Sequence, residues 1–406
     1  MSLNSTPKLR ALDIRPYQQD GQNFYLIRDP LQITEAVLLV PYQLGPVLML
    51  CTGEWDAHAI NGILRLQYGV QFEPDVLESV LNMLDEALLF ENERFAEAQA
   101  RALAAYRQAP FRLPTLAGAG YPAEPTELKH QFDTYLEEAG EATPASSEAR
   151  GLLSPHIDYA RGGAVYAQVW KRAAELARQA ELVVLLGTDH YSAMPGSLTL
   201  TRQNYATPYG VLPTAVGIID ALAHAIGEEA AFAGELRHRG EHSLELVAVW
   251  LHHMRRGQPV PMVPILTGSF SEYIQARQSP IADAKMKAVI ETLQQQTAGK
   301  RVLYVASGDL SHVGPAFGGE PLTAEAKAQL KVMDDELVAR MCAGDADGFY
   351  ASIQRIGDAN NVCGLSPVYL TLKALGATEG QCVAYATCPA DEHDTSVVTV
   401  AGVVFE

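Results

Sequence analysis

Three histidines that each follow an apolar run are the side chains in this sequence best placed to do chemistry together. The runs are predicted strands, residues 152–154 before His156, residues 181–187 before His190 and residues 301–307 before His312. In open α/β sheets, ligands and catalytic groups collect at the carboxyl ends of the strands. If these strands are parallel neighbours, the imidazoles lie along one edge of the sheet, and we expect a shared site there.

Three further residues, His242, Asp309 and Cys363, are candidates for the same site because each follows a predicted strand or lies at the start of a predicted helix. Backbone donors and the positive end of the helix dipole favour anions and thiolates at such positions. Two imidazoles with a thiolate or a carboxylate leave coordination positions open on a metal ion. This set therefore suits iron or another redox metal better than a closed structural zinc site.

Other histidines near these positions have ordinary explanations. His252 and His253 lie within a predicted helix, and His238 lies between two arginines in a predicted loop, so all three are expected at the surface. The glutamates at 241 and 245 suit the first turn of a helix. The sequence thus leaves open whether His242 belongs to the site or only begins that helix.

Predicted strands and helices alternate from residue 151 onward, which is typical of an α/β fold with a central sheet flanked by helices. The other elements expected in this region are helices at about 162–179, 214–226, 245–254, 280–296, 324–341, 345–356 and 365–375, and strands at 197–201, 260–266, 381–387 and 396–405. A turn at 358–364 places Cys363 directly before a helix.

Residues 33–95 are predicted to form a separate small unit. A strand is expected at 36–40 and helices at 44–51, 55–67 and 73–88, with short strands at 24–27 and 88–90. Three short helices with a small β ribbon outline a winged-helix-like α+β domain. The apolar pattern around Thr52 and Gly53 also resembles the small peptide-recognition modules of peptide-modifying radical-enzyme pathways.

The boundary between the two parts follows a predicted connecting helix at 92–108. Prolines and glycines are frequent between residues 110 and 125, which marks an irregular entry into the second part. We therefore predict a winged-helix-like interaction module at 1–108 and an α/β metal-binding domain at 109–406. A chain of 406 residues is long enough for two domains.

Charge excludes nucleic acid as an expected partner. The chain has 48 acidic residues against 30 Lys and Arg, and between residues 33 and 94 there are ten acidic residues, two arginines and no lysine. A DNA-recognition helix in such a field would be repelled by phosphate. We expect an interaction module instead, and a structural dimerisation domain is an equal alternative.

No apolar run approaches the roughly 20 residues that a membrane helix needs, and the start of the sequence lacks a signal-peptide core, so no membrane association is expected. Five scattered cysteines without a CxxC pair favour a reducing compartment, and we expect a cytoplasmic protein.

Five ordered motifs resemble the Memo family, whose bacterial members are called AmmeMemoRadiSam system protein B. The motifs are Ser154-Pro-His-Ile-Asp-Tyr159, Leu186-Gly-Thr-Asp-His190, Glu241-His-Ser-Leu-Glu245, Ser307-Gly-Asp-Leu-Ser-His312 and Asn361-Val-Cys-Gly-Leu-Ser-Pro367. The resemblance runs from about residue 115 to the end, and five motifs in this order make it specific.

The resemblance implies a fold like that of class III extradiol dioxygenases, non-haem iron enzymes that open aromatic rings. It implies metal ligation at His156, His190 and Cys363, with Asp309, His312 and His242 in the same pocket. Those dioxygenases carry a carboxylate where Cys363 stands, and a thiolate is softer, oxidisable and suited to copper(I) as well as iron. The metal expected is a mononuclear ion, Fe(II) first and copper as the alternative.

The expected function is that of a metal-dependent oxidoreductase acting on a small molecule or a peptide side chain. The alternatives are a non-enzymatic metal-binding or scaffold protein, and a hydrolase or transferase with Cys363 as nucleophile. We assign His312, oriented by Asp309, as general base or proton shuttle. The residues expected to support the ligands or touch the substrate are His242, Glu241, Asp189, Tyr159 and Arg161. The family name records a genomic association with a radical-SAM enzyme, so products of neighbouring genes are expected partners.

Overall fold

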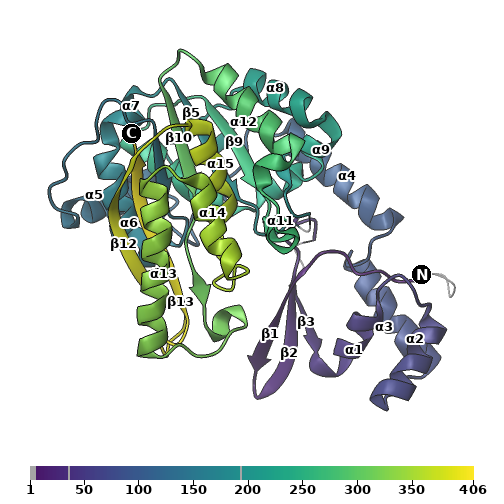
Figure 1. The fold of residues 1–406 in the computed structure, drawn as a ribbon. Helices are drawn as coiled ribbons and strands as arrows, with labels where there is room; N and C mark the ends of the chain where they lie inside the picture. The colour runs from purple at the N-terminus through teal and green to yellow at the C-terminus, as the bar shows by residue number, and fades with distance from the viewer. Residues whose placement is uncertain (1–5, 35–36, 193) are drawn as a thin grey trace. The chain divides into compact units, whose positions relative to one another are not determined.

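The computed structural model describes residues 6–34, 37–192 and 194–406, and the chain divides into two compact units, Met1–Gln108 and Ala109–Glu406 (Figure 1). Each unit has its own apolar core. Ala36, the first residue of the strand predicted at 36–40, lies outside the described residues.

The larger unit is built on an eight-stranded mixed sheet. Its centre is parallel and runs in the order β4 (Gly151–Ser154), β10 (Val302–Ser307), β5 (Leu182–Thr188) and β9 (Met262–Thr267). Antiparallel strands extend both sides, with β6 (Leu198–Leu200) beside β9, and β13 (Val397–Phe405) beside β4, β11 (His312–Val313) and β12 (Gly380–Pro389). The prediction of a central sheet flanked by helices is confirmed.

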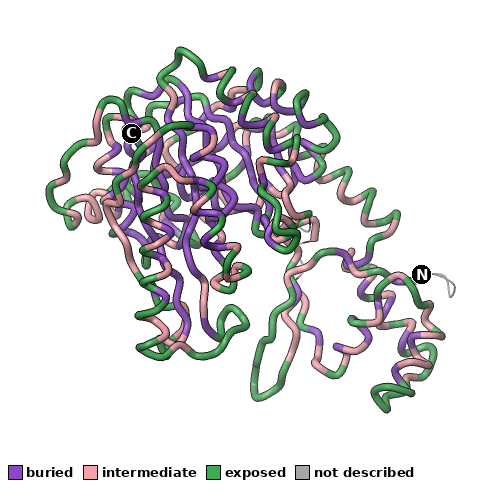
Figure 2. Tube along the Cα trace, in the orientation of Figure 1, coloured by how far each residue is buried: buried purple, intermediate pink, exposed green. Residues whose placement is uncertain are grey.

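Helices cover both faces of this sheet because the central strands are apolar along their whole length and need cover on both sides. Val183 and Leu185 pack into one core cluster, while Val184 and Leu186 pack into the other. The cluster that contains Val183 and Leu185 includes α5 (Pro125–Glu138), α6 (Tyr159–Arg172), α7 (Ala174–Gln179) and α10 (His242–Met254). The other cluster includes α8 (Val216–Ile226), α12 (Ala284–Thr297), α13 (Ala324–Cys342), α14 (Ala346–Arg355) and α15 (Leu365–Leu375). Figure 2 shows the central strands as the most continuously buried part of the chain.

Short elements complete the larger unit, namely α9 (Glu228–Phe232), α11 (Ser271–Ala276) and the hairpin of β7 (Tyr205–Thr207) and β8 (Gly210–Leu212). The helix predicted at 162–179 is two helices, α6 and α7, which meet at Ala173.

Strand register brings the predicted site residues to one edge of the sheet. Ser307 at the end of β10 is paired with Ser154 of β4 on one side and with Gly187 of β5 on the other. The loops that carry His156, His190 and Asp309 therefore leave the sheet side by side, as the strand-and-histidine pattern predicted.

Close backbone packing brings the turn before α15 to the same edge. The amide of Gly364 donates to the carbonyl oxygen of Asp309 at 2.9 Å. A Cβ on Gly308 would lie 2.5 Å from the Cα of Gly364, so only glycine allows this approach. Cys363, the residue before Gly364, is thereby held beside the loop after β10.

The smaller unit combines an antiparallel sheet with four helices. The strands are β1 (Asp13–Gln19), β2 (Gln22–Arg28) and β3 (Leu38–Pro41), and the helices are α1 (Gly45–Leu50), α2 (Ala57–Ile63), α3 (Pro74–Glu86) and α4 (Glu93–Gln108). The helix predicted at 55–67 is α2 followed by a π-helical turn, Leu64–Tyr68. The strand predicted at 88–90 is a single bridge between Leu9 and Phe90. The winged-helix assignment stays a prediction.

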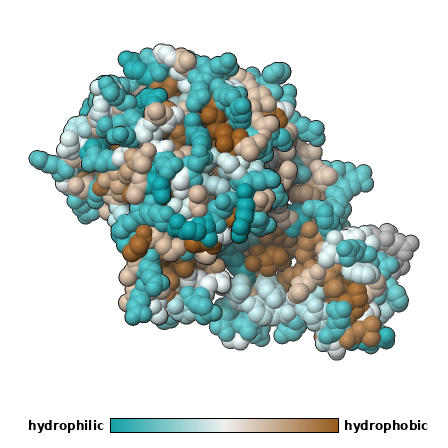
Figure 3. All heavy atoms as spheres, viewed as in Figure 1, coloured by the Kyte–Doolittle hydropathy of each residue, from teal (hydrophilic) through white to brown (hydrophobic). Residues whose placement is uncertain are grey.

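Among the described residues, no helix is long and apolar enough to cross a membrane. On the face drawn in Figure 3, hydrophilic side chains are spread over the larger unit with small apolar areas between them, and apolar side chains are also exposed on the smaller unit.

Candidate metal centre

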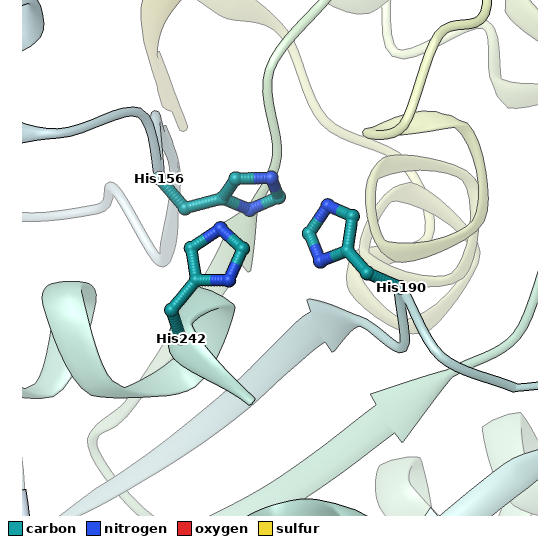
Figure 4. A group of neighbouring side chains, drawn as sticks. All are labelled: His156, His190 and His242. Atoms are coloured by element: carbon teal, nitrogen blue, oxygen red, sulfur yellow. The ribbon is translucent and has the colours of Figure 1, made fainter. Parts of the chain in front are cut away.

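Three imidazoles converge at the carboxyl edge of the parallel strands (Figure 4). The ring centroids of His190 and His242 lie 4.7 Å apart and the rings are stacked, with 17° between their planes. The ring of His156 lies edge-on to both, 5.0 Å from His190 and 5.4 Å from His242. One ligand nitrogen from each histidine falls within 4.8 Å of the others, so these three could hold one metal ion.

The carboxylate of Glu241 holds two of these rings. Glu241 is the N-cap of α10 and accepts a hydrogen bond from the amide of Ser243 at 2.9 Å. The same side chain accepts from the amide of His190 at 2.9 Å and from its Nδ1 at 3.0 Å, and it lies 3.1 Å from Nδ1 of His242. Because a carboxylate only accepts, both Nδ1 atoms carry their hydrogens toward Glu241, and Nε2 is the nitrogen left for a ligand.

A pair of serine contacts orients the third ring. The hydroxyl of Ser307 donates to the carbonyl oxygen of Ser243 at 2.6 Å, so its oxygen accepts from Nδ1 of His156 at 3.2 Å. Nε2 of His156 therefore also carries the lone pair, and it faces Sγ of Cys363 at 3.1 Å. All three histidines thus present the same nitrogen to the site.

Asp309 and Cys363 complete a second donor group with His156. Ligand atoms of these three residues also lie within 4.8 Å of one another. The Asp309 carboxylate is 3.8 Å from Nε2 of His156 and accepts from the amides of His156 at 2.8 Å and Ile157 at 3.2 Å. The carbonyl oxygen of Cys363 accepts from the hydroxyl of Thr188 at 2.7 Å, which ties its turn to the end of β5.

Burial and mutual charge set the protonation of this cluster. Burial, together with the neighbouring histidines, holds the pKa of His156 well below its ordinary value. Burial also disfavours charge on His190, but Glu241 and Cys363 beside it raise its pKa well above the ordinary value. Although burial opposes ionisation of Glu241, His190 and His242 hold its pKa well below the usual range. Burial raises the pKa of the Cys363 thiol and of the Asp309 carboxyl.

His312 lies on the same edge and is oriented by main-chain atoms. Its Nδ1 is 3.2 Å from the carbonyl oxygens of Leu310 and Asn361, so that nitrogen carries the hydrogen. Burial lowers the pKa of His312. The ring of Phe317 lies edge-on to it, with 5.1 Å between centroids. The expected partner Asp309 acts on His312 through its charge, while its Oδ1 accepts from two main-chain amides.

The remaining predicted residues have structural partners. Asp189 forms a buried ion pair with Arg237 at 2.6 Å. Tyr159 is completely buried in the aromatic core and donates to the carbonyl oxygen of Leu246 at 2.7 Å. Arg161, on the first turn of α6, is paired with Asp158 at 2.6 Å and donates to the carbonyl oxygen of Pro389.

The three peripheral histidines expected at the surface are not there. The side chain of His253 is only 8% exposed, and its Nδ1 lies 3.1 Å from the hydroxyl of Tyr209. His238 is fully buried between Tyr205, whose hydroxyl is 2.6 Å from Nδ1, and the carbonyl oxygen of Thr199. His252 is buried as well, with Nδ1 at 2.7 Å from the hydroxyl of Thr207. The partners of His238 and His252 belong to β6 and β7, and contacts between such distant segments are not visible as a sequence pattern.

Sequence reasoning also missed the residues that hold α10 in place. Arg112 forms a buried ion pair with Glu245 and donates to the carbonyl oxygens of His238 at 2.8 Å and Glu241 at 2.9 Å. The Glu245 carboxylate also accepts from the hydroxyl of Tyr121 at 2.6 Å. Arg112 lies between Pro110 and Pro114 in the predicted linker, and only its isolation as a charge in an apolar stretch could have signalled burial.

This donor set fits a redox or borderline divalent metal. Imidazole suits zinc, copper, iron and nickel, and thiolate suits copper(I), zinc and iron. Metal-ligating histidines usually donate their other ring nitrogen to a carboxylate or another fixed acceptor, as Glu241 and Ser307 provide here. The residues present therefore meet the requirements of such an ion at both donor and supporting positions.

Comparison with known proteins gives a family match over the larger unit and relatives that match different shares of the chain. A sequence model of the family described as Memo-like protein matches residues 112–404. A MEMO1 family protein of Aquifex aeolicus is 28% identical over 412 residues, covering 98% of this chain and 99% of that protein. A MEMO1 family protein of Methanopyrus kandleri is 29% identical over 305 residues, covering 72% of this chain and 98% of that protein. The Caenorhabditis elegans protein memo-1 homolog is 28% identical over 268 residues, covering 64% of this chain and 69% of that protein.

Proposed function

This chain belongs to the Memo-like family, and from that premise we propose that its larger unit is a metal-dependent oxidoreductase with a mononuclear Fe(II) site, copper being the alternative ion. The substrate class is a small molecule or a peptide side chain. The observation that carries this proposal is the convergence of imidazoles whose Nδ1 atoms are already engaged by Glu241 and Ser307. Such prepared nitrogens are the usual environment of a bound metal.

His156, His190 and Cys363 are the proposed ligands. A redox metal bound by two imidazoles and a thiolate would supply one-electron chemistry and open positions for substrate. The residues around it hold the ligands in place, since Glu241 fixes His190 and Asp309 fixes the backbone of His156. Asp309 also contributes negative charge at the edge, which favours cation binding.

His312 is the proposed proton acceptor. Its Nδ1 hydrogen is directed to main-chain carbonyl oxygens, so a proton would be taken up at Nε2. The lowered pKa keeps the ring neutral, and therefore able to accept a proton, at neutral pH. Phe317 covers part of this ring and would limit its contact with water.

The reading of Cys363 as a free nucleophile is less well supported. A nucleophilic cysteine normally has a lowered pKa, whereas burial raises that of Cys363. A metal ion would overcome this because a coordinating thiol is deprotonated.

The test is metal analysis of anaerobically purified protein, followed by alkylation kinetics. We expect about one equivalent of metal in the parent protein, loss of metal in His156→Ala and His190→Ala, and retention of iron in Cys363→Asp, which restores a two-histidine, one-carboxylate set. Fe(II) should protect Cys363 from alkylation, with the other four cysteines as internal controls. A metal-free parent protein whose Cys363 reacts fastest, with or without Fe(II), would favour the nucleophile instead. Absence of oxidative turnover by the loaded protein would favour a non-enzymatic metal-binding role.

A further inference from the structure

We propose that His242 is a metal ligand, so that His156, His190 and His242 form a three-imidazole site that holds an ion without help from sulfur. This inference rests on the proposed metal centre and concerns the same edge of the sheet. It gives His242, which the sequence placed only among the supporting residues, a direct bond to the ion.

The shared carboxylate is the first reason. Oε1 of Glu241 lies 3.0 Å from Nδ1 of His190 and 3.1 Å from Nδ1 of His242, so the two rings are held alike. Two stacked rings fixed at the same nitrogen by the same oxygen extend their Nε2 atoms in the same direction. A histidine that served only to position a neighbour would not need the same support as a ligand.

The position of His156 is the second reason. Its plane stands at 78° to the planes of both His190 and His242, and Figure 4 shows the three rings facing a common space. The edge-on ring of His156 thus adds a third nitrogen to the space that the two stacked rings face, and three histidines that leave a fourth position open are a known ligand set for a catalytic metal ion. The side chain of Glu241, about 1% exposed, supplies a buried negative charge that offsets the charge of the ion.

The two donor groups share only His156, and this predicts how the site responds to loss of sulfur. When an ion is bound, the group of His156, Asp309 and Cys363 would contribute a thiolate and a carboxylate, whereas the group of His156, His190 and His242 would contribute only imidazole nitrogens. The thiolate favours a soft ion such as copper(I), and imidazoles favour borderline divalent ions. We therefore expect a divalent ion to remain bound when Cys363 is removed.

The experiment is anaerobic cobalt(II) titration of the parent protein, Cys363→Ala, His242→Ala and the double variant, with His224→Ala, an exposed histidine on α8, as the matched control. We expect Cys363→Ala to bind one equivalent of cobalt(II) and to lose the sulfur-to-cobalt charge-transfer absorption. In the Cys363→Ala background, His242→Ala should weaken cobalt(II) binding by more than about 100-fold, beyond the roughly 10- to 100-fold typical of a group that only orients a ligand.

Paramagnetic proton NMR of the cobalt(II) form of Cys363→Ala gives a count of ligands that needs no change at His242. Each bound imidazole contributes one shifted, exchangeable Nδ1–H signal, and we expect three. Two signals, or no cobalt(II) binding by Cys363→Ala while the parent binds it, would overturn the inference and leave the proposed metal centre standing. A parent protein that binds no cobalt(II), Fe(II) or copper would overturn both.

Discussion

Glu241 is the residue on which most of the site's geometry depends. Its carboxylate caps α10 and contacts both His190 and His242, so one buried group fixes a helix start and two rings together. A buried carboxylate is costly unless it is paired, and here the histidines provide the pairing. The cost of burying this carboxylate is offset by its contacts with His190 and His242, which it also orients.

Replacement of Glu241 by glutamine should weaken metal binding by roughly 10- to 100-fold, because an amide can no longer accept from both rings. Cobalt(II) affinity measures this effect. Glu272→Gln, an exposed first-turn residue of α11, is the matched control and should bind like the parent. Equal affinity of Glu241→Gln and the parent would show that the carboxylate does not support the ligands.

Asp358, in the turn before Cys363, should make stability depend on pH. Burial raises its pKa to about 6 from an ordinary value near 3.8. A raised pKa means that the folded state holds the proton more tightly than the unfolded state. The contribution of protonated Asp358 to the stability of the protein is therefore present below about pH 4 and is lost as pH rises through 6. Above that pH the carboxylate is charged and partly buried.

Asp358→Asn should therefore stabilise the protein at pH 7 by roughly 1–2 kcal/mol and have little effect at pH 4. Asparagine retains an oxygen that can accept from the amide of Val362, as Asp358 does at 2.9 Å. Urea unfolding at both pH values measures the difference. Asp20→Asn is the control, because Asp20 has a similar positive φ, 50° against 55°, in an exposed turn. A stabilisation equal at both pH values would contradict the charge argument.

At the scale of elements, α10 is held by an ion pair that lies outside the candidate metal centre. Arg112, near the start of the larger unit, pairs with Glu245 and also donates to the carbonyl oxygen of Glu241. The start of α10, with Glu241 and His242, is thereby tied to a segment more than a hundred residues earlier in the chain. Removal of one partner leaves the other charge buried and unpaired.

Arg112→Met or Glu245→Gln should each lower the free energy of unfolding by about 3–5 kcal/mol, the range for breaking a buried ion pair. The exposed pair of Arg301 and Glu181 is the matched comparison. Arg301→Met should change the free energy of unfolding by less than about 1 kcal/mol. Chemical denaturation measures both. Small effects from both substitutions at Arg112 and Glu245 would mean that water reaches the pair and that α10 does not depend on it.

At the scale of the whole molecule, the relatives match different shares of the chain. The match to the Aquifex aeolicus protein covers 98% of this chain. The match to the Methanopyrus kandleri protein covers 72% of this chain and 98% of that protein. The family match begins at residue 112, close to the start of the larger unit at Ala109. The candidate metal centre therefore lies entirely within the part of the chain that the family model matches.

We propose that the smaller unit binds a basic or neutral polypeptide, such as the product of a neighbouring gene, and delivers it to the metal site. The acidic residues between 33 and 94 carry this proposal, and β1 offers a sheet edge for pairing with an extended peptide. Residues 1–108 should bind such a partner at moderate salt and should not bind duplex DNA. Salt-sensitive DNA binding at micromolar affinity would contradict the charge argument, and a stable dimer that binds no partner would favour the structural role.

The sequence predicted where the candidate ligands lie better than it predicted the residues that contact and orient them. His156 and His190 follow buried strands whose apolar runs are unambiguous, and parallel pairing then brings them together. Ser307 was not predicted as a supporting group because its role depends on the carbonyl oxygen of Ser243, a contact between a strand and a helix. Strand β1 was not predicted because its residues are mostly polar and exposed, so no alternating apolar pattern marks it.

The spacing of the donors along the chain has a consequence for biosynthesis. The three imidazoles come from residues 156, 190 and 242, whereas Asp309 and Cys363 follow much later, and the strands that pair beneath them span most of the larger unit. Domains generally fold as units during synthesis, and distant strand pairing is slow. β10 lies between β4 and β5 and is synthesised after all three histidines. The loops that carry His156 and His190 are therefore not brought together until that strand joins the sheet. A metal ion held by these three histidines could therefore be bound only after β10 has joined the sheet.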